Sequence, residues 1–97
     1  MKGLVFGLTF VDACNKLNDI RMNYALHHIP IESERKTKHE YAITFKNGDY
    51  WRAVPACENR RGCKANVSYI DHRIDEDFIP IIMNCIAVGP WNATHYY

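Results

Sequence analysis

YAITFKNGDYWRAV, residues 41–54, is the stretch that decides the fold. Large apolar and smaller or polar residues alternate over 41–45, Asn47-Gly48 follows, and an extended pattern resumes over 49–54. A period of two is typical of a strand with one buried face. Asn-Gly between two such runs favours a type I′ turn, in which both central residues have positive φ angles. The stretch therefore predicts a β-hairpin.

A two-residue turn also fixes which residues of the hairpin face each other. With Asn47 and Gly48 as the turn, Phe45 is expected opposite Tyr50 and Thr44 opposite Trp51. Pro55 has no N–H to donate, so we expect it to end the second strand.

The segment before the hairpin predicts a strand followed by a helix. Gly3 to Thr9 is short and largely apolar, and the period then changes to that of a helix capped by Thr9 or Asp12. Pro30 prevents much continuation, so the helix should end near His27. One helical face carries Phe10, Ala13, Cys14, Leu17, Ile20, Arg21 and Tyr24. The charged segment from Ser33 to Glu40 is expected to be a polar connector.

Beyond the hairpin, residues 56–65 indicate a polar loop and residues 67–71 a short strand. Acidic residues at 75–77 favour the start of a second helix, whose apolar face would run over 78–86. A buried strand over 79–88 is the alternative, because periodicity cannot separate helix from strand in a short apolar run. The tail, residues 89–97, is aromatic and either docks on the domain or forms an oligomer contact.

The predicted architecture is a small single domain spanning residues 1–97, because 97 residues cannot sustain two hydrophobic cores. Its class is α/β or α+β, with a central β-hairpin and two helices. A net charge of +1 argues against a protein that coats polyanions. No apolar stretch is long enough to span a membrane.

Four cysteines could form two disulfides in a secreted chain, but the N-terminal sequence favours a cytoplasmic compartment. The apolar run after Lys2 is interrupted by Gly7 and Thr9 and no small-residue cleavage site follows, which is unlike a signal peptide. Inside a cell, thiols stay reduced rather than forming disulfides. The cysteines are Cys14, Cys57, Cys63 and Cys85.

Three passages carry a family resemblance: LVFGLTFVDACNKLNDI (4–20), ITFKNGDYWRAVPACENRRGCKANVSYID (43–71) and IDEDFIPIIM (74–83). In this order they resemble part of the ATPase core of phage terminase large subunits, the motors that package DNA. In this alignment Ala13 occupies the position at which the family carries a recurrent small residue in its helix. The likeness covers about residues 3–83 and implies a fold like a shortened P-loop ATPase core.

Departures from the family pattern imply that the chain is not an enzyme. The phosphate-binding motif G-x-x-x-x-G-K-[ST] is missing from the sequence. Asp71 matches the family's magnesium-associated aspartate, but His72 stands where the catalytic glutamate is expected. Without a phosphate-binding loop or a catalytic base, ATP hydrolysis would lack both electrostatic stabilisation and positioning of the attacking nucleophile. The resemblance then implies a phage protein, with a degenerate ATPase scaffold, in the cytoplasm of an infected host cell.

A basic and aromatic cluster is the predicted ligand-binding site. Arginine side chains can fork onto phosphates while an aromatic ring stacks on a base. The alternative is a solvated loop beside an ordinary half-buried hairpin. The cluster consists of Tyr50, Trp51, Arg52, Asn59, Arg60, Arg61 and Lys64.

No metal or other cofactor is expected. Asp71 and Asp75 could hold Mg²⁺, but acidic runs of this kind more often start a helix or complement a basic patch. Cys57 and Cys63, with His72 or His39, are spaced too widely for a typical structural zinc site. His27-His28 is expected to contact carbonyls at the end of the first helix.

The leading functional hypothesis is a non-enzymatic binding protein that captures a nucleotide or other phosphate-bearing ligand. It could act in counter-defence, sequestering a nucleotide signal or blocking a partner. The alternative is a nucleic-acid-binding accessory of DNA packaging, which the near-zero net charge disfavours. A hydrolase built on His72, Asp71 and the cysteines is the weakest hypothesis. A homo-oligomer is slightly favoured, because small domains gain stability by association.

Overall fold

A computed structural model of the chain describes residues 1–55, 66–78 and 93–97. Along the chain its elements are β1 (Lys2–Gly7), α1 (Phe10–Leu26), β2 (Ile31–Lys36), β3 (Tyr41–Phe45), β4 (Tyr50–Pro55), β5 (Val67–Ile70), the short 3₁₀ helix η1 (Glu76–Phe78) and β6 (Ala93–Tyr96). No helix in these ranges is long and apolar enough to cross a bilayer.

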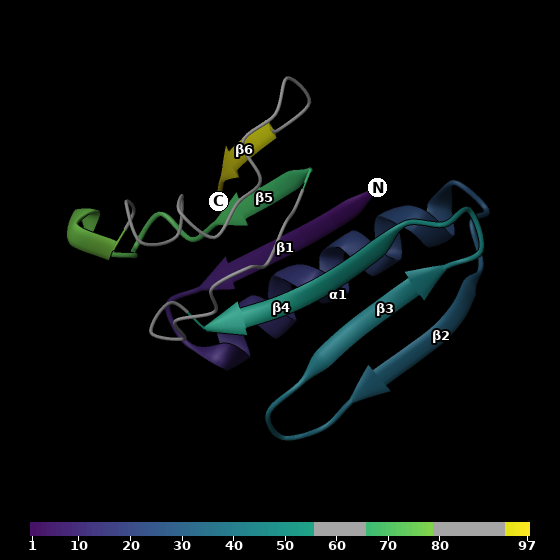
Figure 1. Ribbon diagram of the computed structural model, residues 1–97, viewed down its shortest axis with the longest axis horizontal. Helices are drawn as coiled ribbons and strands as arrows, with labels where there is room; N and C mark the ends of the chain where they lie inside the picture. The colour runs from purple at the N-terminus through teal and green to yellow at the C-terminus, as the bar shows by residue number, and fades with distance from the viewer. Residues whose placement is uncertain (56–65, 79–92) are drawn as a thin grey trace.

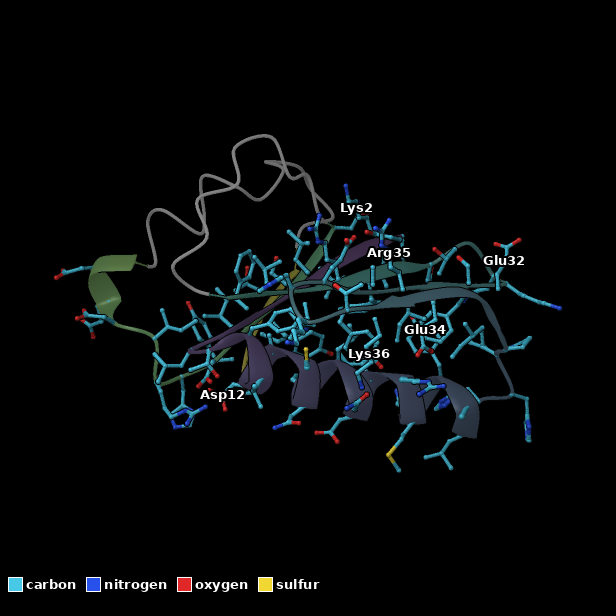
Figure 2. The ribbon with its side chains drawn as sticks, turned by 90° about the horizontal axis from the view of Figure 1, so that it is seen from below. Lys2, Asp12, Glu32, Glu34, Arg35 and Lys36 are labelled. Carbon is cyan, nitrogen blue, oxygen red and sulfur yellow. The ribbon has the colours of Figure 1, made fainter. Side chains whose placement is uncertain are left out.

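The strands form one mixed sheet in the order β2-β3-β4-β1-β5-β6 (Figure 1). β1 runs parallel to β4 and β5, and β6 runs parallel to β5. β3 is antiparallel to both β2 and β4. α1 lies across one side of this sheet (Figure 2). The α/β or α+β class predicted from the sequence is confirmed.

α1 begins and ends where the sequence predicts. The Thr9 hydroxyl accepts a hydrogen bond from the Asp12 N–H at 3.2 Å, and the Asp12 carboxylate accepts one from the Thr9 N–H at 3.2 Å. This capping box satisfies donors that the first helical turn leaves unpaired. At the other end His27 is the C-cap, and its Nδ1 lies 2.9 Å from the Asn23 carbonyl oxygen. The expected contact of this histidine with the helix terminus is therefore confirmed.

The main core lies between α1 and the sheet. Ala13, Leu17 and Ile20 are the buried residues of α1, and they recur at the spacing of one helical face. Side chains from three strands, β1, β3 and β4, complete the cluster: Val5, Tyr41, Ile43, Phe45, Trp51 and Ala53. β1 is buried on both of its faces, as is typical of a central parallel strand.

The hairpin is confirmed, but its predicted register and turn type are wrong. Thr44 pairs with Tyr50, and Ile43 pairs with Trp51. The Phe45 N–H donates to the Asp49 carbonyl at 2.8 Å, so the loop between them has a third residue, Lys46. Gly48 has φ +94°, whereas Asn47 does not have a positive φ.

The side chain of Asn47 explains the different turn. Its oxygen accepts a hydrogen bond from the Asp49 N–H at 3.0 Å, which holds Asn47 in a negative-φ conformation. Gly48 donates its N–H to the Phe45 carbonyl at 3.0 Å and alone supplies the left-handed residue. This is the pattern of a three-residue hairpin loop, in which a type I turn is followed by glycine.

The segment from Ser33 to Glu40 was expected to be a connector, and this expectation is wrong for its first half. Residues up to Lys36 form β2, the outermost strand beside β3. An edge strand bonds through its backbone on one side only, so its charged side chains can remain in water. Two of them make ion pairs: Arg21 with Glu34 at 3.3 Å, and Arg35 with Glu40 at 3.4 Å.

The C-terminal tail docks on the domain. β6 pairs with β5, and the Tyr97 hydroxyl donates to the Phe6 carbonyl at 2.9 Å. The predicted strand over residues 67–71 is confirmed as β5. The expected second helix over 78–86, its strand alternative over 79–88 and Trp91 lie outside the described residues, apart from position 78 at the end of η1.

Candidate functional site

β4 divides the predicted ligand-binding cluster between the two faces of the sheet. Successive side chains of a strand point to opposite faces, so Tyr50 and Arg52 share one face and Trp51 lies on the other. Trp51 is 3% exposed and belongs to the core under α1, whereas Tyr50 and Arg52 are half-buried. The remaining predicted residues, Asn59, Arg60, Arg61 and Lys64, lie outside the described residues.

Trp51 is held as a structural residue. Its Nε1 donates to the Tyr24 hydroxyl at 2.9 Å, and that hydroxyl donates to the Asp49 carboxylate at 2.7 Å. Burial, together with the neighbouring Asp49, raises the pKa of Tyr24 to about 12, so the hydroxyl keeps its proton. The Tyr24 ring also stacks on Phe45 with 3.9 Å between centroids. Trp51 therefore presents no face on which a ligand base could stack.

Tyr50 and Arg52 instead lie beside basic residues of two other strands. Lys2 of β1 pairs with Tyr50, and its ammonium lies 5.9 Å from the centre of the Tyr50 ring. On the other side, Arg52 pairs with Ala42, which in turn pairs with Arg35 of β2. Figure 2 shows Lys2 and Arg35 on the side of the sheet away from α1. We call Lys2, Arg35, Tyr50 and Arg52 the cationic face.

The positive charge of this face is most concentrated at β1 and β4. Arg35 is paired with Glu40, and Glu32 lies on the same side of the sheet (Figure 2). Near Lys2 and Tyr50 the surface is hollowed by about 530 Å³, with Gly48 and Asn66 in the lining. The Asn66 side chain accepts the Lys2 backbone N–H at 3.0 Å, which fixes the rim of this hollow.

A second group of charges lies where β5 ends and α1 begins. Arg73 reaches Asp71 through Nε at 3.1 Å and through a terminal nitrogen at 2.7 Å, and the same nitrogen lies 2.9 Å from Asp12. The Leu8 N–H also donates to Asp71, at 3.3 Å. The hydrogen bonds from Arg73 outweigh the burial of the carboxylate and lower the pKa of Asp71 to about 2.

This arrangement bears on the metal hypotheses. Asp71, one of the two magnesium-ligand candidates from the sequence, directs both oxygens at Arg73, and Asp75 accepts a hydrogen bond from the Asp77 N–H at 3.0 Å. Asp71 is thus paired with Arg73, whereas most of the basic loop that its segment was expected to complement lies outside the described residues. Within the described ranges, no three histidine, cysteine, aspartate or glutamate side chains gather as metal ligands. Cys57 and Cys63 lie outside those ranges.

Sequence reasoning missed Lys2 and Arg35. Their proximity to Tyr50 and Arg52 depends on the parallel pairing of β1 with β4 and on the β2 edge strand, and neither has a local sequence signal. The separation of Trp51 from Tyr50 and Arg52 could have been predicted, because it follows from the period of a strand.

The chain matches no known family model, no curated protein and no solved structure. The resemblance to terminase large subunits therefore stays a prediction.

Proposed function

We propose that this chain is a non-enzymatic binding protein that captures a nucleotide or related phosphate-bearing ligand on its cationic face. The observation that carries the proposal is the register of β1 with β4, which places Lys2 beside Tyr50, with Arg52 two residues along the same face. A lysine and an arginine can both donate to phosphate oxygens. A half-exposed tyrosine between them offers a ring on which a base can stack.

The non-enzymatic part of the proposal is supported by the carboxyl end of β5. A magnesium-binding aspartate needs an open oxygen, and both oxygens of Asp71 accept hydrogen bonds from Arg73. His72, which follows it, directs Nδ1 at the Tyr97 carbonyl oxygen at 2.6 Å. The Asp71 carboxylate is therefore already engaged by Arg73, and one ring nitrogen of His72 is engaged by Tyr97.

The proposed setting is the cytoplasm of a phage-infected cell, where such a protein would sequester a nucleotide signal or block a partner in counter-defence. The terminase resemblance supports the phage origin. The free thiol of Cys14 is compatible with a reducing compartment.

Calorimetry against mono-, di- and cyclic nucleotides tests the proposal. We expect Lys2→Ala and Arg52→Ala each to weaken the best ligand by about tenfold or more, because a hydrogen bond to a charged group contributes roughly 1.5–3 kcal/mol. Lys36→Ala is the matched control, since Lys36 lies on the α1 side of the sheet (Figure 2). Unchanged affinity in both cationic-face variants, or equal loss in the control, would refute the proposal.

A second candidate, binding of a single nucleic-acid strand, is favoured by the position of Arg35. This residue lies on β2, and β3 and β4 separate it from Lys2 on β1, so the cations extend across the sheet. A short single-stranded oligonucleotide distinguishes the two candidates. A strand that contacts several cations should bind with a steep salt dependence, whereas a mononucleotide should show a shallow one.

A further inference from the structure

An aromatic ladder crosses the α1 side of the sheet. The Trp51 and Tyr69 rings lie 5.7 Å apart between centroids, and Tyr69 stacks on His95 at 5.0 Å. These three residues come from β4, β5 and β6, so the ladder passes over β1. It can do so because residue 3 is glycine: a Cβ there would lie 2.4 Å from the Trp51 ring.

The ladder lines a hollow of about 410 Å³ between α1 and the sheet. Its other wall comes from α1, where Lys16, Asp19 and Asn23 follow one another at helical spacing. The inner wall is fixed by the hydrogen bonds from Trp51 to Tyr24 and from Tyr24 to Asp49. Asp19, Asn23 and His95 are exposed to solvent, so the hollow is open to a ligand.

The Lys16 ammonium is held above the aromatic residues. It lies 5.1 Å from the centre of the Tyr69 ring and 5.3 Å from that of Tyr97. Attraction between a cation and two aromatic faces restricts where this side chain can go. The wall contributed by α1 thus presents a positioned positive charge, and one helical turn further it presents the carboxylate of Asp19.

We propose that this hollow is a second binding site, separate from the cationic face, which takes a guanine base. A planar base packs against the rings of Tyr69 and His95, the two ladder residues that are not buried. The acceptors O6 and N7 of guanine suit the ammonium of Lys16, in the way that lysine recognises guanine in DNA. The N1–H and N2–H₂ donors of guanine suit the two oxygens of Asp19. Adenine lacks this combination of donors, and a hollow of 410 Å³ is within the range of sites for small ligands.

The probes are nucleosides without phosphate, so that the site is tested independently of the cationic face. We expect guanosine to bind saturably by calorimetry, and inosine, which lacks the 2-amino group, to bind less tightly. Adenosine and cytidine should bind at least about tenfold more weakly, since leaving a charged group without its hydrogen bond costs about that much.

Three pairs of variants complete the test. Asp19→Asn should weaken guanosine by about tenfold or more, with Glu32→Gln as the control of equal charge change on the other side of the sheet. His95→Ala should weaken guanosine severalfold, with the exposed His39 changed to Ala as its control. Arg52→Ala should leave guanosine binding unchanged, whereas Lys16→Ala should reduce it.

The outcomes separate this proposal from the proposed function. Loss of guanosine binding in Asp19→Asn but not in Arg52→Ala supports a separate base site, whatever nucleotides do on the cationic face. No saturable binding of guanosine, equal binding of adenosine, or full binding in Asp19→Asn would each overturn the base site. Circular dichroism of every variant verifies that the fold is retained.

Discussion

The two faces of the sheet differ in burial and in charge, although β4 contributes to both. On the α1 face, Ile43, Phe45 and Trp51 are at most 3% exposed. On the opposite face Val54 is buried near the end of β4, while Tyr50 and Arg52 at its beginning are half-buried. One face therefore supplies the main core and the other keeps cationic and aromatic groups within reach of solvent. The next four predictions test this division of roles.

Trp51→Ala should have the largest effect on stability. Removing the ring leaves a cavity in the core and deprives the Tyr24 hydroxyl of its donor. Truncation of a buried tryptophan typically costs 3–5 kcal/mol, so we expect a loss of about 3 kcal/mol or more in urea unfolding. Trp51→Phe, which keeps an aromatic ring, should cost less. A loss below about 1 kcal/mol for Trp51→Ala would contradict the assignment of this residue to the core.

Acid should weaken the attachment of α1 to its face of the sheet through Asp71. Its folded pKa of about 2 lies below the ordinary value of 3.8, so its stabilising effect is complete above about pH 4 and declines as the pH falls towards 2. The shift corresponds to about 2 kcal/mol. Asp71→Asn should lose about that much stability at neutral pH and flatten the acid limb of the stability curve.

Asp75→Asn is the control for this prediction, because Asp75 is exposed and makes no ion pair among the described residues. It should leave the acid limb of urea unfolding almost unchanged. If Asp71→Asn gave a curve parallel to that of the unmodified protein between pH 2 and 4, the Arg73 contacts would not contribute to stability.

Gly48→Val should have an intermediate effect, because the turn determines which side chains of β4 point to which face. At φ +94° a β-branched residue is strained, and a Cβ at this position meets nothing within 4 Å. The cost is therefore that of the backbone alone, about 1–3 kcal/mol. Thermal unfolding measures it, with Lys46→Ala in the same loop as the control. Equal melting temperatures for the two variants would be evidence against the left-handed glycine.

Arg52→Ala should have the smallest effect on stability and a large effect on binding. We expect a change below about 1 kcal/mol, since surface substitutions away from special features are usually small. The affinity for a phosphate-bearing ligand should nevertheless fall by about tenfold or more. Trp51→Phe makes the reverse comparison: it should lower the stability but leave the affinity for the phosphate-bearing ligand of the cationic face unchanged. A large loss of stability in Arg52→Ala would show that the cationic face is also structural.

Local signals in the sequence were sufficient for α1, β1, β5 and the existence of the hairpin. Thr9 caps the helix and the apolar residues of α1 repeat at the helical period, so the start of the helix and its buried face could be predicted without tertiary information. The register of the hairpin could not, because it depends on a hydrogen bond between the Asn47 side chain and the Asp49 backbone. β2 was missed because its stabilisation comes from pairing with β3 and not from burial of its own side chains.

The candidate sites depend on contacts between distant parts of the chain. Parallel pairing brings Lys2 to Tyr50. Parallel strands are joined by a long connection and not by a tight turn, so no turn residues in the sequence indicate this pairing. The contacts of Arg73 with Asp12 arise in the same way, because the end of β5 lies beside the start of α1. The composition of residues 71–77 indicated charge at this end of the strand but not its partner.

The charged edge strand β2 has a consequence for behaviour at high protein concentration. Its residues from Glu32 to Lys36 are all exposed and carry charges of both signs. Pairing a strand of another molecule with this edge would bring those charges close together and remove water from them. This cost disfavours the strand-by-strand extension of the sheet that leads to fibrils. An isologous association of two copies through another surface of the molecule would remain a closed pair and would not extend into a filament through β2.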